Sequence, residues 1–571
     1  MTRQASSSSG IEAVQAALIA GDLAHARDAL ERVSSDSDDP LSHYVRAATL
    51  LAGGETDAGE AALDQARRLH ALQVIQASGG DLQRLAADPA YAVEVARQFY
   101  NAKQMAPAAL AFAHVAAATN PSMSWAMQVH GEALQYEGRV EEASTALAAA
   151  LALEPGPARH SLYLYSLFFV ADGPRRHAEE ARRWSRLWAD QTTPPQPRFA
   201  VERRVDRRLR IGYIAPSFTT NQLRQFVQPL LAAHDQEAVE VFLYVEAAER
   251  EVAPGHVRLR STQGLEAAAV AQQVRQDRID ILVDVWGHAA RNILPVFALK
   301  PAPVQVGWLN YLQSTGMPAM DAVLHADFMD APGKAETFTE EICGLGPVNA
   351  LYAPDPAARP SPPPAGARGY VTFASFNHPA KLSAATLSAW GRILRACPMA
   401  RLKFKYAPFS DPVLQSQMQA RFLGAGVDPG RLEFEGHSSG EEYEQAFTQI
   451  DLALDPSPCP GGTTTLEAFS HGVPVLTRAG EDFYARMGVQ PMMALGLPEM
   501  IAGSWDDYVE KAVGLAHDLP GLARLRAEIR PRFDASAYQD GPGFARRLEA
   551  VYRGLFDDWL ARQPGATELA A

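Results

Sequence analysis

The sequence predicts a helical repeat region followed by two α/β lobes with a cleft between them. An alanine-rich, helically periodic stretch comes first, and strand-like apolar runs alternate with helical patterns from residue 209 onward. A proline-rich segment divides that alternation into two series. We therefore expect a repeat domain over 1–190, a linker over 191–208, a first lobe over 209–352, an interlobe linker over 353–369, and a second lobe over 370–571 that ends in helices.

Composition limits the classes of partner. The chain has 571 residues, of which 47% are apolar and 21% charged, and its formal net charge is −14. Such an acidic balance argues against nonspecific nucleic-acid binding. No apolar run reaches the roughly 20 residues of a membrane helix, and the polar start MTRQASSSSG lacks a secretory signal. We expect a cytoplasmic protein with no membrane or nucleic-acid partner.

Three cysteines, Cys343, Cys397 and Cys459, are widely spaced along the chain. Their odd number and spacing indicate neither a disulfide framework nor a zinc site. The cysteines therefore indicate no metal cofactor.

The first region repeats a pattern of small and apolar residues at an interval of 35 residues. One unit contains Gly138, Val140, Ala143, Leu147 and Pro155; the next has Gly173 and Ala178; the preceding one has Lys103, Met105, Ala108, Phe112 and Pro121; a further copy has Gly21, Ala26, Leu30 and Pro40. This resembles the tetratricopeptide repeat (TPR), whose period is about 34 residues. Stacked helix pairs form a solenoid with a concave groove, which we expect to bind a protein or peptide. The alternative is a generic helical domain.

Strand-like runs follow in two series. The first series comprises 209–214, 239–245, 279–285 and 304–308, with a helix near 222–234. The second comprises 370–375, 401–405, 431–435, 452–455 and 473–477, with helices over 383–397 and 463–470. Ligands of open parallel sheets bind at the carboxyl ends of the strands, so the cleft between the lobes is the expected site.

The most informative run lies between Asp455 and Thr477. A strand ends at Asp455, and Gly461 and Gly462 in the following loop allow close approach to the backbone. Thr463, Thr464 and Thr465 then offer hydroxyls and N–H groups at a helix N-terminus, where a diphosphate would fit. Glu467, in the first turn, is placed to accept hydrogen bonds from ribose hydroxyls. The alternative is that the threonines only cap the helix.

A second run, Phe376-Asn377-His378-Pro379-Ala380-Lys381, follows the first strand of the second lobe. Lys381 would neutralise charge on a departing phosphate. The alternative is an ordinary surface lysine.

Several motifs together resemble the O-GlcNAc transferase/SPINDLY family. They are Lys300–Trp308, Ser375–Lys381, Asp455–Glu467, Gly480–Arg486 and Gly496–Met500. The resemblance implies a GT-B fold with two Rossmann-like lobes. It also implies a metal-independent, inverting transferase that uses a nucleotide-diphosphate sugar as substrate and modifies Ser or Thr of a protein.

The resemblance also implies roles for single residues. Lys381 would contact the diphosphate, and His378, beside Asn377, occupies the place of a donor-contacting glutamine. Thr463 and Thr464 would bind phosphate, and Glu467 would bind the ribose. The loop over 436–443 would hold the base through backbone groups of Ser438 and stacking on Tyr443.

This chain departs from the family pattern around the sugar and the acceptor. Asn221 stands where the family usually has a histidine, and asparagine cannot act as a general base at neutral pH. The family's Gly-Tyr-Pro-Gly-Thr turn reads differently over Asn310–Thr315, and its basic residue near Gly440 is missing. Two alternatives follow: a flagellin glycosyltransferase with a CMP-linked nonulosonic-acid donor, and an inactive repeat protein that only binds partners.

The expected chemistry is direct displacement at the anomeric carbon with inversion. Besides Lys381 and the position of Asn221, the candidate catalytic groups are two possible bases at the end of the strand over 279–285. His288 is the first, because Trp286-Gly-His-Ala follows the strand into the expected cleft, and Asp284 is the second. The alternative for His288 is a loop histidine that only forms hydrogen bonds.

Overall fold

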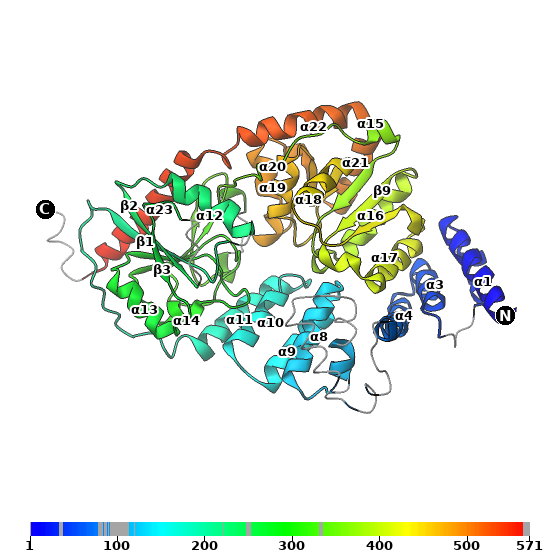
Figure 1. Ribbon diagram of the computed structural model, residues 1–571, viewed down its shortest axis with the longest axis horizontal. Helices are drawn as coiled ribbons and strands as arrows, with labels where there is room; N and C mark the ends of the chain where they lie inside the picture. Colours follow the sequence, from blue (N-terminus) through cyan, green and yellow to red (C-terminus); the bar gives the residue numbers. More distant parts are fainter. Residues whose placement is uncertain are drawn as a thin grey trace.

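The computed structural model describes residues 2–33, 38–77, 84, 88, 91, 113–118, 120–219, 221–246, 253–329 and 335–563. The expected repeat unit with Lys103, Met105, Ala108 and Phe112 lies outside these residues. Three parts are visible in Figure 1: a helical arm, an N-terminal lobe and a C-terminal lobe. Among the described residues, no helix combines the length and hydropathy that a membrane span needs.

The arm consists of antiparallel helix pairs. Its helices are α1 (Thr2–Ile19), α2 (Leu23–Leu30), α3 (Pro40–Ala52), α4 (Thr56–Ala77), α8 (Ser124–Tyr136), α9 (Val140–Leu153), α10 (Pro157–Ser166) and α11 (Gly173–Trp188). Gly138, between α8 and α9, has a φ of 76°, a left-handed conformation that glycine adopts without steric cost. Gly131 allows the pair to pack closely, because a Cβ there would lie 2.6 Å from Leu147 Cγ. The small residues therefore serve the turns and close packing expected of a helical repeat.

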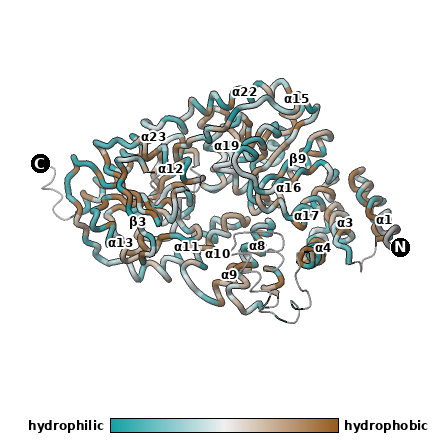
Figure 2. The backbone as a smooth tube through the Cα atoms, in the orientation of Figure 1, coloured by the Kyte–Doolittle hydropathy of each residue, from teal (hydrophilic) through white to brown (hydrophobic). Residues whose placement is uncertain are grey.

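The N-terminal lobe is a seven-stranded parallel sheet in the order β3-β2-β1-β4-β5-β6-β7. The strands are β1 (Leu209–Ile214), β2 (Val239–Val245), β3 (Arg258–Ser261), β4 (Ile281–Asp284), β5 (Val304–Gly307), β6 (Ala322–His325) and β7 (Glu341–Gly344). Helices α12 (Asn221–Ala233), α13 (Ala267–Gln276) and α14 (Leu294–Ala298) connect them. Central strands are buried on both faces, which explains their continuous apolar runs. Figure 2 shows these strands as a mainly hydrophobic centre.

The C-terminal lobe is a six-stranded parallel sheet in the order β10-β9-β8-β11-β12-β13. The strands are β8 (Thr372–Ser375), β9 (Arg401–Lys405), β10 (Leu432–Glu435), β11 (Leu452–Leu454), β12 (Val475–Arg478) and β13 (Ile501–Ala502). Its helices are α15 (Ala365–Arg368), α16 (Ala384–Ala396), α17 (Pro412–Gly424), α18 (Glu441–Ala446), α19 (Thr463–Ser470), α20 (Val489–Ala494), α21 (Trp505–His517) and α22 (Leu519–Asp534). Two parallel sheets with connecting helices confirm the predicted pair of Rossmann-like lobes.

The last helix, α23 (Gly541–Ala561), leaves the C-terminal lobe and packs on the N-terminal one. The Tyr552 hydroxyl lies 3.2 Å from that of Tyr213 in β1, and Glu549 pairs with His234 at 2.7 Å. The predicted domain division placed all C-terminal helices in the second lobe. In the structure the chain returns to the N-terminal lobe at α23, so it crosses between the lobes twice. Sequence periodicity shows that α23 is amphipathic but does not say which lobe it covers.

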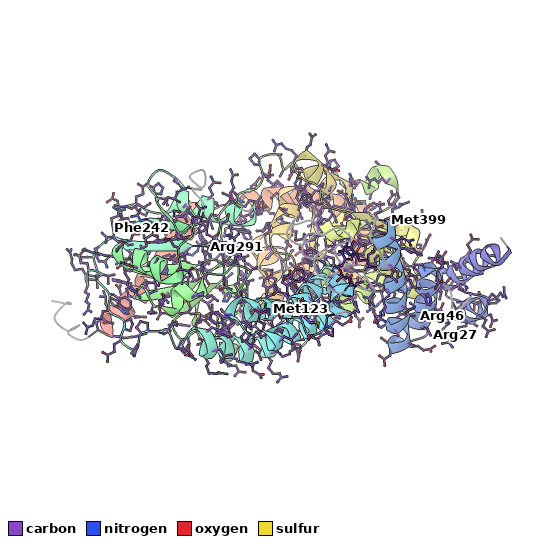
Figure 3. The ribbon with its side chains drawn as sticks, turned by 60° about the horizontal axis from the view of Figure 1, so that its bottom comes forward. Arg27, Arg46, Met123, Phe242, Arg291 and Met399 are labelled. Carbon is purple, nitrogen blue, oxygen red and sulfur yellow. The ribbon has the colours of Figure 1, made fainter. Side chains whose placement is uncertain are left out.

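The arm contacts both lobes. At one end Arg182 of α11 donates a hydrogen bond to the Glu336 carbonyl of the N-terminal lobe, at 2.7 Å. At the other end Arg421 of α17 pairs with Glu60 of α4 through both carboxylate oxygens, at 2.7 and 2.8 Å. Figure 3 shows the arm from below, with Arg27 and Arg46 near its outer end and Phe242 in the N-terminal lobe. The arm therefore bridges the N-terminal and C-terminal lobes.

Candidate functional site

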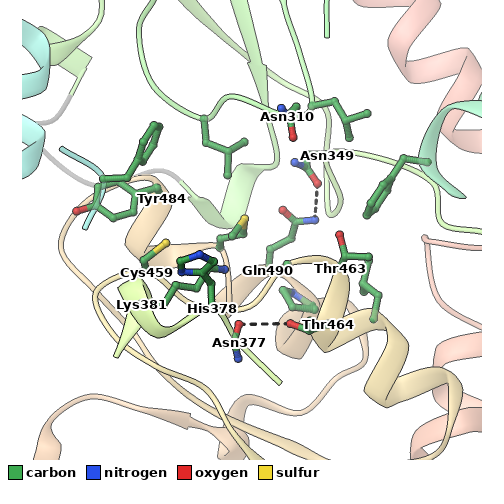
Figure 4. A pocket seen from close by; sticks show the side chains of 18 of the residues that line it. Asn310, Asn349, Asn377, His378, Lys381, Cys459, Thr463, Thr464, Tyr484 and Gln490 are labelled. Carbon is green, nitrogen blue, oxygen red and sulfur yellow. Dashed lines mark hydrogen bonds between the residues drawn. The ribbon is translucent and has the colours of Figure 1, made fainter. Parts of the chain in front are cut away.

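A cavity of about 330 Å³ lies where the two lobes and the arm meet (Figure 4). The arm contributes Gln135, Tyr165, Phe168 and Phe169; the N-terminal lobe contributes residues that include Leu223, Phe226, Asn310, Leu312 and Asn349; the C-terminal lobe contributes residues that include Asn377, His378, Lys381, Tyr406, Cys459, Gly462, Thr463, Thr464, Tyr484 and Gln490. The cavity is thus at the carboxyl ends of β8 and β11, as the topology predicts.

One buried carboxylate holds the loop that precedes α19. Asp455 accepts hydrogen bonds from the Gly461 amide at 2.6 Å and from the Thr477 hydroxyl at 2.9 Å. Burial raises the pKa of Asp455 to about 6, although both hydrogen bonds favour its charged form. Glycine at position 461 avoids crowding, because a Cβ there would lie 2.7 Å from Thr464 Oγ1 and 2.8 Å from Thr465 Oγ1. The loop is therefore folded tightly under the start of the helix.

Helix α19 begins at Thr463, and its N-cap is Gly462, which has no side chain to cap the helix. Thr463 and Thr464 line the cavity, while Thr465 is buried behind them. The threonines are therefore not the caps of this helix, contrary to the alternative interpretation of the run. The start of α19, with Thr463 and Thr464, borders a space in which an anion would be favoured.

Lys381 reaches the same loop from the other side of the cavity. It ends the 3-10 turn η3 (Pro379–Lys381) after β8, and its Nζ donates to the Pro460 carbonyl at 2.8 Å. Lys381 lines the cavity together with Thr463 and Thr464. The structure therefore brings together the lysine and the helix end that the sequence singled out.

Asn377 and His378 support this arrangement. The Thr464 hydroxyl lies 3.5 Å from Asn377 Oδ1, and His378 Nδ1 accepts from the Ala380 amide at 3.0 Å. Burial, together with the nearby charge of Lys381, lowers the pKa of His378 to about 3. His378 is therefore neutral at physiological pH. It lines the cavity as a hydrogen-bonding group whose Nδ1 is already engaged by the backbone.

The residues expected to bind ribose and base form a neighbouring group that is not part of the cavity lining. Tyr443 donates to Glu467 at 2.8 Å, and burial raises the pKa of Glu467 to about 7. Lys405 donates to Ser438 at 2.6 Å, and its Nζ lies 5.6 Å from the centre of the Tyr443 ring. Sequence reasoning missed Lys405, a cation paired with Glu435 that lies beside a loop in which the family's basic residue is missing. The feature of the sequence that could have identified Lys405 is the pair of lysines at alternate positions of β9.

The two candidate bases lie elsewhere. His288 is fully buried, its Nδ1 lies 2.9 Å from the Ser161 hydroxyl, and its Nε2 lies 2.9 Å from the Thr315 carbonyl. Burial lowers the pKa of His288 to about 3. Both ring nitrogens are therefore engaged between the arm and the N-terminal lobe. His288 does not line the cavity, so the expectation that its segment points into the cleft was wrong.

Asp284 also has a structural environment. Its carboxylate accepts from the amides of Trp286 and Gly287, each at 3.0 Å, and burial raises the pKa of Asp284 to about 6. It holds the turn after β4 and does not reach the main cavity. Asn221 is the first residue of α12, whose Leu223 and Phe226 do line the cavity.

Two glutamines in the lining were also missed. Gln490, in α20, and Gln135, in α8, stand in apolar surroundings that indicate core or helix packing when read from sequence alone. The sequence around either glutamine carries no signal of a site, because their place in the lining depends on how the arm and the lobes pack.

Comparisons with known proteins show the relatives of this chain. Residues 167–346 and 366–547 match the model of glycosyl transferase family 41. A probable UDP-N-acetylglucosamine–peptide N-acetylglucosaminyltransferase SPINDLY from Hordeum vulgare is 34% identical over 66% of this chain and 41% of its own length. The corresponding protein SEC of Arabidopsis thaliana is 28% identical over 61% of this chain and 37% of its own.

The matched part of the chain thus spans about two fifths of the length of the curated relatives. Among solved structures, an O-GlcNAc transferase from Thermobaculum terrenum, crystallised as a lysine-to-methionine variant, has a TM-score of 0.74 and 29% identity. The match covers 98% of this chain and 99% of that one, arm included. The chain belongs to glycosyl transferase family 41, the group that contains the O-GlcNAc transferases and SPINDLY proteins.

Proposed function

We propose that the protein transfers a sugar from a nucleotide-sugar donor to a serine or threonine hydroxyl of a protein, with inversion and without a metal ion. The observation that carries the proposal is the meeting of Lys381 with Thr463 and Thr464 around one cavity between the lobes. A cation and a helix N-terminus on opposite sides suit a diphosphate. The names of the relatives support a protein acceptor.

The proposed step is a single displacement. The acceptor oxygen forms a bond to the anomeric carbon as the bond from that carbon to the diphosphate oxygen breaks, and the acceptor proton leaves to a base. Lys381 and the first turn of α19 stabilise the negative charge that develops on the departing diphosphate. His288 and Asp284 are not proposed as the base, since neither reaches the cavity.

The arm gives the acceptor a place to dock. Tyr165, Phe168 and Phe169 extend from the end of α10 into the cavity lining, so an acceptor bound along the arm is carried to the reacting atoms. We propose a protein acceptor for this surface; flagellin is one candidate.

A thermal-shift screen with UDP, GDP and CMP tests the proposal. Stabilisation by UDP or GDP supports a diphosphate donor, whereas stabilisation by CMP alone favours a nonulosonic-acid donor. If none of the three stabilises the wild type while a family-41 enzyme of known activity responds, the protein is an inactive partner-binding protein. Intact-mass measurement of co-expressed acceptors then identifies the sugar from the added mass.

A further inference from the structure

Gln490 is held in one orientation at the wall of the cavity. Its Nε2 donates to Asn349 Oδ1 and to the Tyr538 hydroxyl, both at 2.8 Å. Asn349 is itself fixed, because its backbone carbonyl accepts from Trp308 Nε1 at 2.7 Å. The network joins the N-terminal lobe, α20 and the segment that leads to α23. Figure 4 shows Gln490 in the middle of the lining, bonded to Asn349.

The other end of the same amide lacks a partner. Gln490 is only 2% exposed, and its Oε1 has no hydrogen-bond partner among the described residues, although the side chain lines the cavity. A buried acceptor left unpaired has lost its hydration without gaining a hydrogen bond in return. The Gln490 amide is held at its nitrogen and unpaired at its oxygen. It therefore suits a ligand that donates a hydrogen bond to Oε1.

The chemistry of Oε1 restricts that ligand group. An amide oxygen only accepts hydrogen bonds, and so do the ionised oxygens of a phosphate, so Oε1 cannot bind the diphosphate itself. The ribose and base of a nucleotide are expected beside Glu467 and Tyr443, outside the lining. The remaining donors of a nucleotide sugar are the hydroxyl or amide N–H groups of the transferred sugar.

We propose that Gln490 is a specificity-determining residue whose Oε1 accepts a hydrogen bond from a hydroxyl or amide N–H of the donor sugar. The inference rests on the proposed function, because it assigns a part of the same donor site. A site built around a fixed acceptor discriminates against a sugar that lacks a matching donor, since the buried oxygen then stays unpaired.

Calorimetric titration of the full chain with matched pairs of probes tests the inference. The pairs are UDP with UDP-N-acetylglucosamine, GDP with GDP-mannose, and CMP with CMP-N-acetylneuraminate. Gln490→Met keeps the length of the side chain and removes its amide. It should raise the Kd of the nucleotide sugar about tenfold while changing the Kd of the free nucleotide less than twofold.

Tyr538→Phe is the matched control, because it removes one anchor of Gln490 and leaves Oε1 in place. It should retain most of the preference for the nucleotide sugar. Equal weakening of both members of a pair by Gln490→Met, or no weakening of either, overturns the inference and leaves the proposed function standing. Failure of the wild type to bind any of the six probes overturns the proposed function and this inference with it.

Discussion

The ring of Tyr136, in α8 of the arm, meets the ring of His378, in the C-terminal lobe, edge to face with centroids 4.9 Å apart. Immediately beside this contact, a Cβ on Gly138 would lie 3.0 Å from the Pro379 carbonyl. His378 and Pro379 belong to the turn that ends in Lys381. The arm is therefore packed directly against the turn that carries the candidate phosphate ligand.

Replacement of Tyr136 by alanine should disturb that turn. An aromatic pair of this geometry contributes about 0.5–1.5 kcal/mol beyond the area it buries, so we expect the free energy of unfolding to fall by at least about 1 kcal/mol and the nucleotide Kd to rise several-fold. Tyr136→Phe keeps the ring and should behave as wild type. Denaturant unfolding and calorimetric titration measure the two effects. Unchanged nucleotide affinity in the alanine variant would show that the arm does not support the donor site.

Lys381→Ala should abolish most of the sugar transfer and leave the fold intact. Removal of a group that stabilises transition-state charge costs on the order of 10²–10³ in rate, while the half-buried side chain donates a hydrogen bond to the Pro460 carbonyl. Lys511→Ala is the matched control, because Lys511 Nζ also donates to a backbone carbonyl, that of Ile501 at 2.6 Å, away from the cavity. Steady-state rates measure the loss of sugar transfer, and melting temperatures show whether the variant is folded. Near-normal turnover of Lys381→Ala would refute the assignment of Lys381 to the phosphate site.

Much of the fold could be predicted because the local sequence pattern determines where these strands and helices form. The strands at 209–214, 239–245 and 401–405 have the predicted bounds, since each is a run of β-branched or alternating apolar residues. Strands β3 and β7 were not predicted, because they are short, partly exposed edge strands with little apolar pattern. Strand β6 was not predicted either, since its four residues carry too short a signal.

The candidate site also has a part that could be predicted from the sequence and a part that could not. The Gly-Gly-Thr-Thr-Thr run could be interpreted because its loop and helix are contiguous in sequence, and the structure places Lys381 beside it. Gln135 and Gln490 could not be found, since their position in the lining depends on how the arm and lobes pack. His288 was misplaced for a related reason: its partner Ser161 lies 127 residues away in the arm.

His288→Ala should therefore destabilise the protein and leave the chemistry almost unchanged. The variant leaves the Ser161 hydroxyl and the Thr315 carbonyl without their partner and opens a cavity, for a cost of about 3 kcal/mol. Ser161→Ala should cost about 1 kcal/mol, because only one hydrogen bond is lost. Unfolding curves and turnover per folded molecule separate stability from catalysis. A large loss of turnover at unchanged stability would restore His288 as the base.

Asp411 should make the stability of the chain depend on pH. It is 2% exposed and caps α17 by accepting from the Val413 amide at 2.9 Å. Burial, with a smaller contribution from nearby Glu137, raises the pKa of Asp411 from 3.8 to about 7. Between these values the folded state holds a proton that the unfolded state has lost, so its contribution to stability falls as pH rises from about 4 through 7.

Asp411→Asn keeps the cap and removes the titration. Relative to this variant, the wild type should lose up to roughly 1.4 kcal/mol of stability per pH unit across that window. Urea unfolding at pH 4 to 8 measures the difference. Parallel stability curves for the two proteins would contradict the prediction.

Gly424, the last residue of α17, marks the second contact between arm and C-terminal lobe. A Cβ there would lie 2.9 Å from the Ala48 carbonyl and 3.2 Å from Leu51 Cβ, both in α3. Gly424→Leu should improve the intrinsic stability of α17 but push α3 away, because backbone cannot yield as a flexible side chain does. Amide exchange in α3 should become faster. Gly514→Leu in α21, where nothing lies within 4 Å of the added Cβ, should leave exchange in α3 unchanged. Equal protection of α3 in the two variants would mean that the arm is not held by this contact.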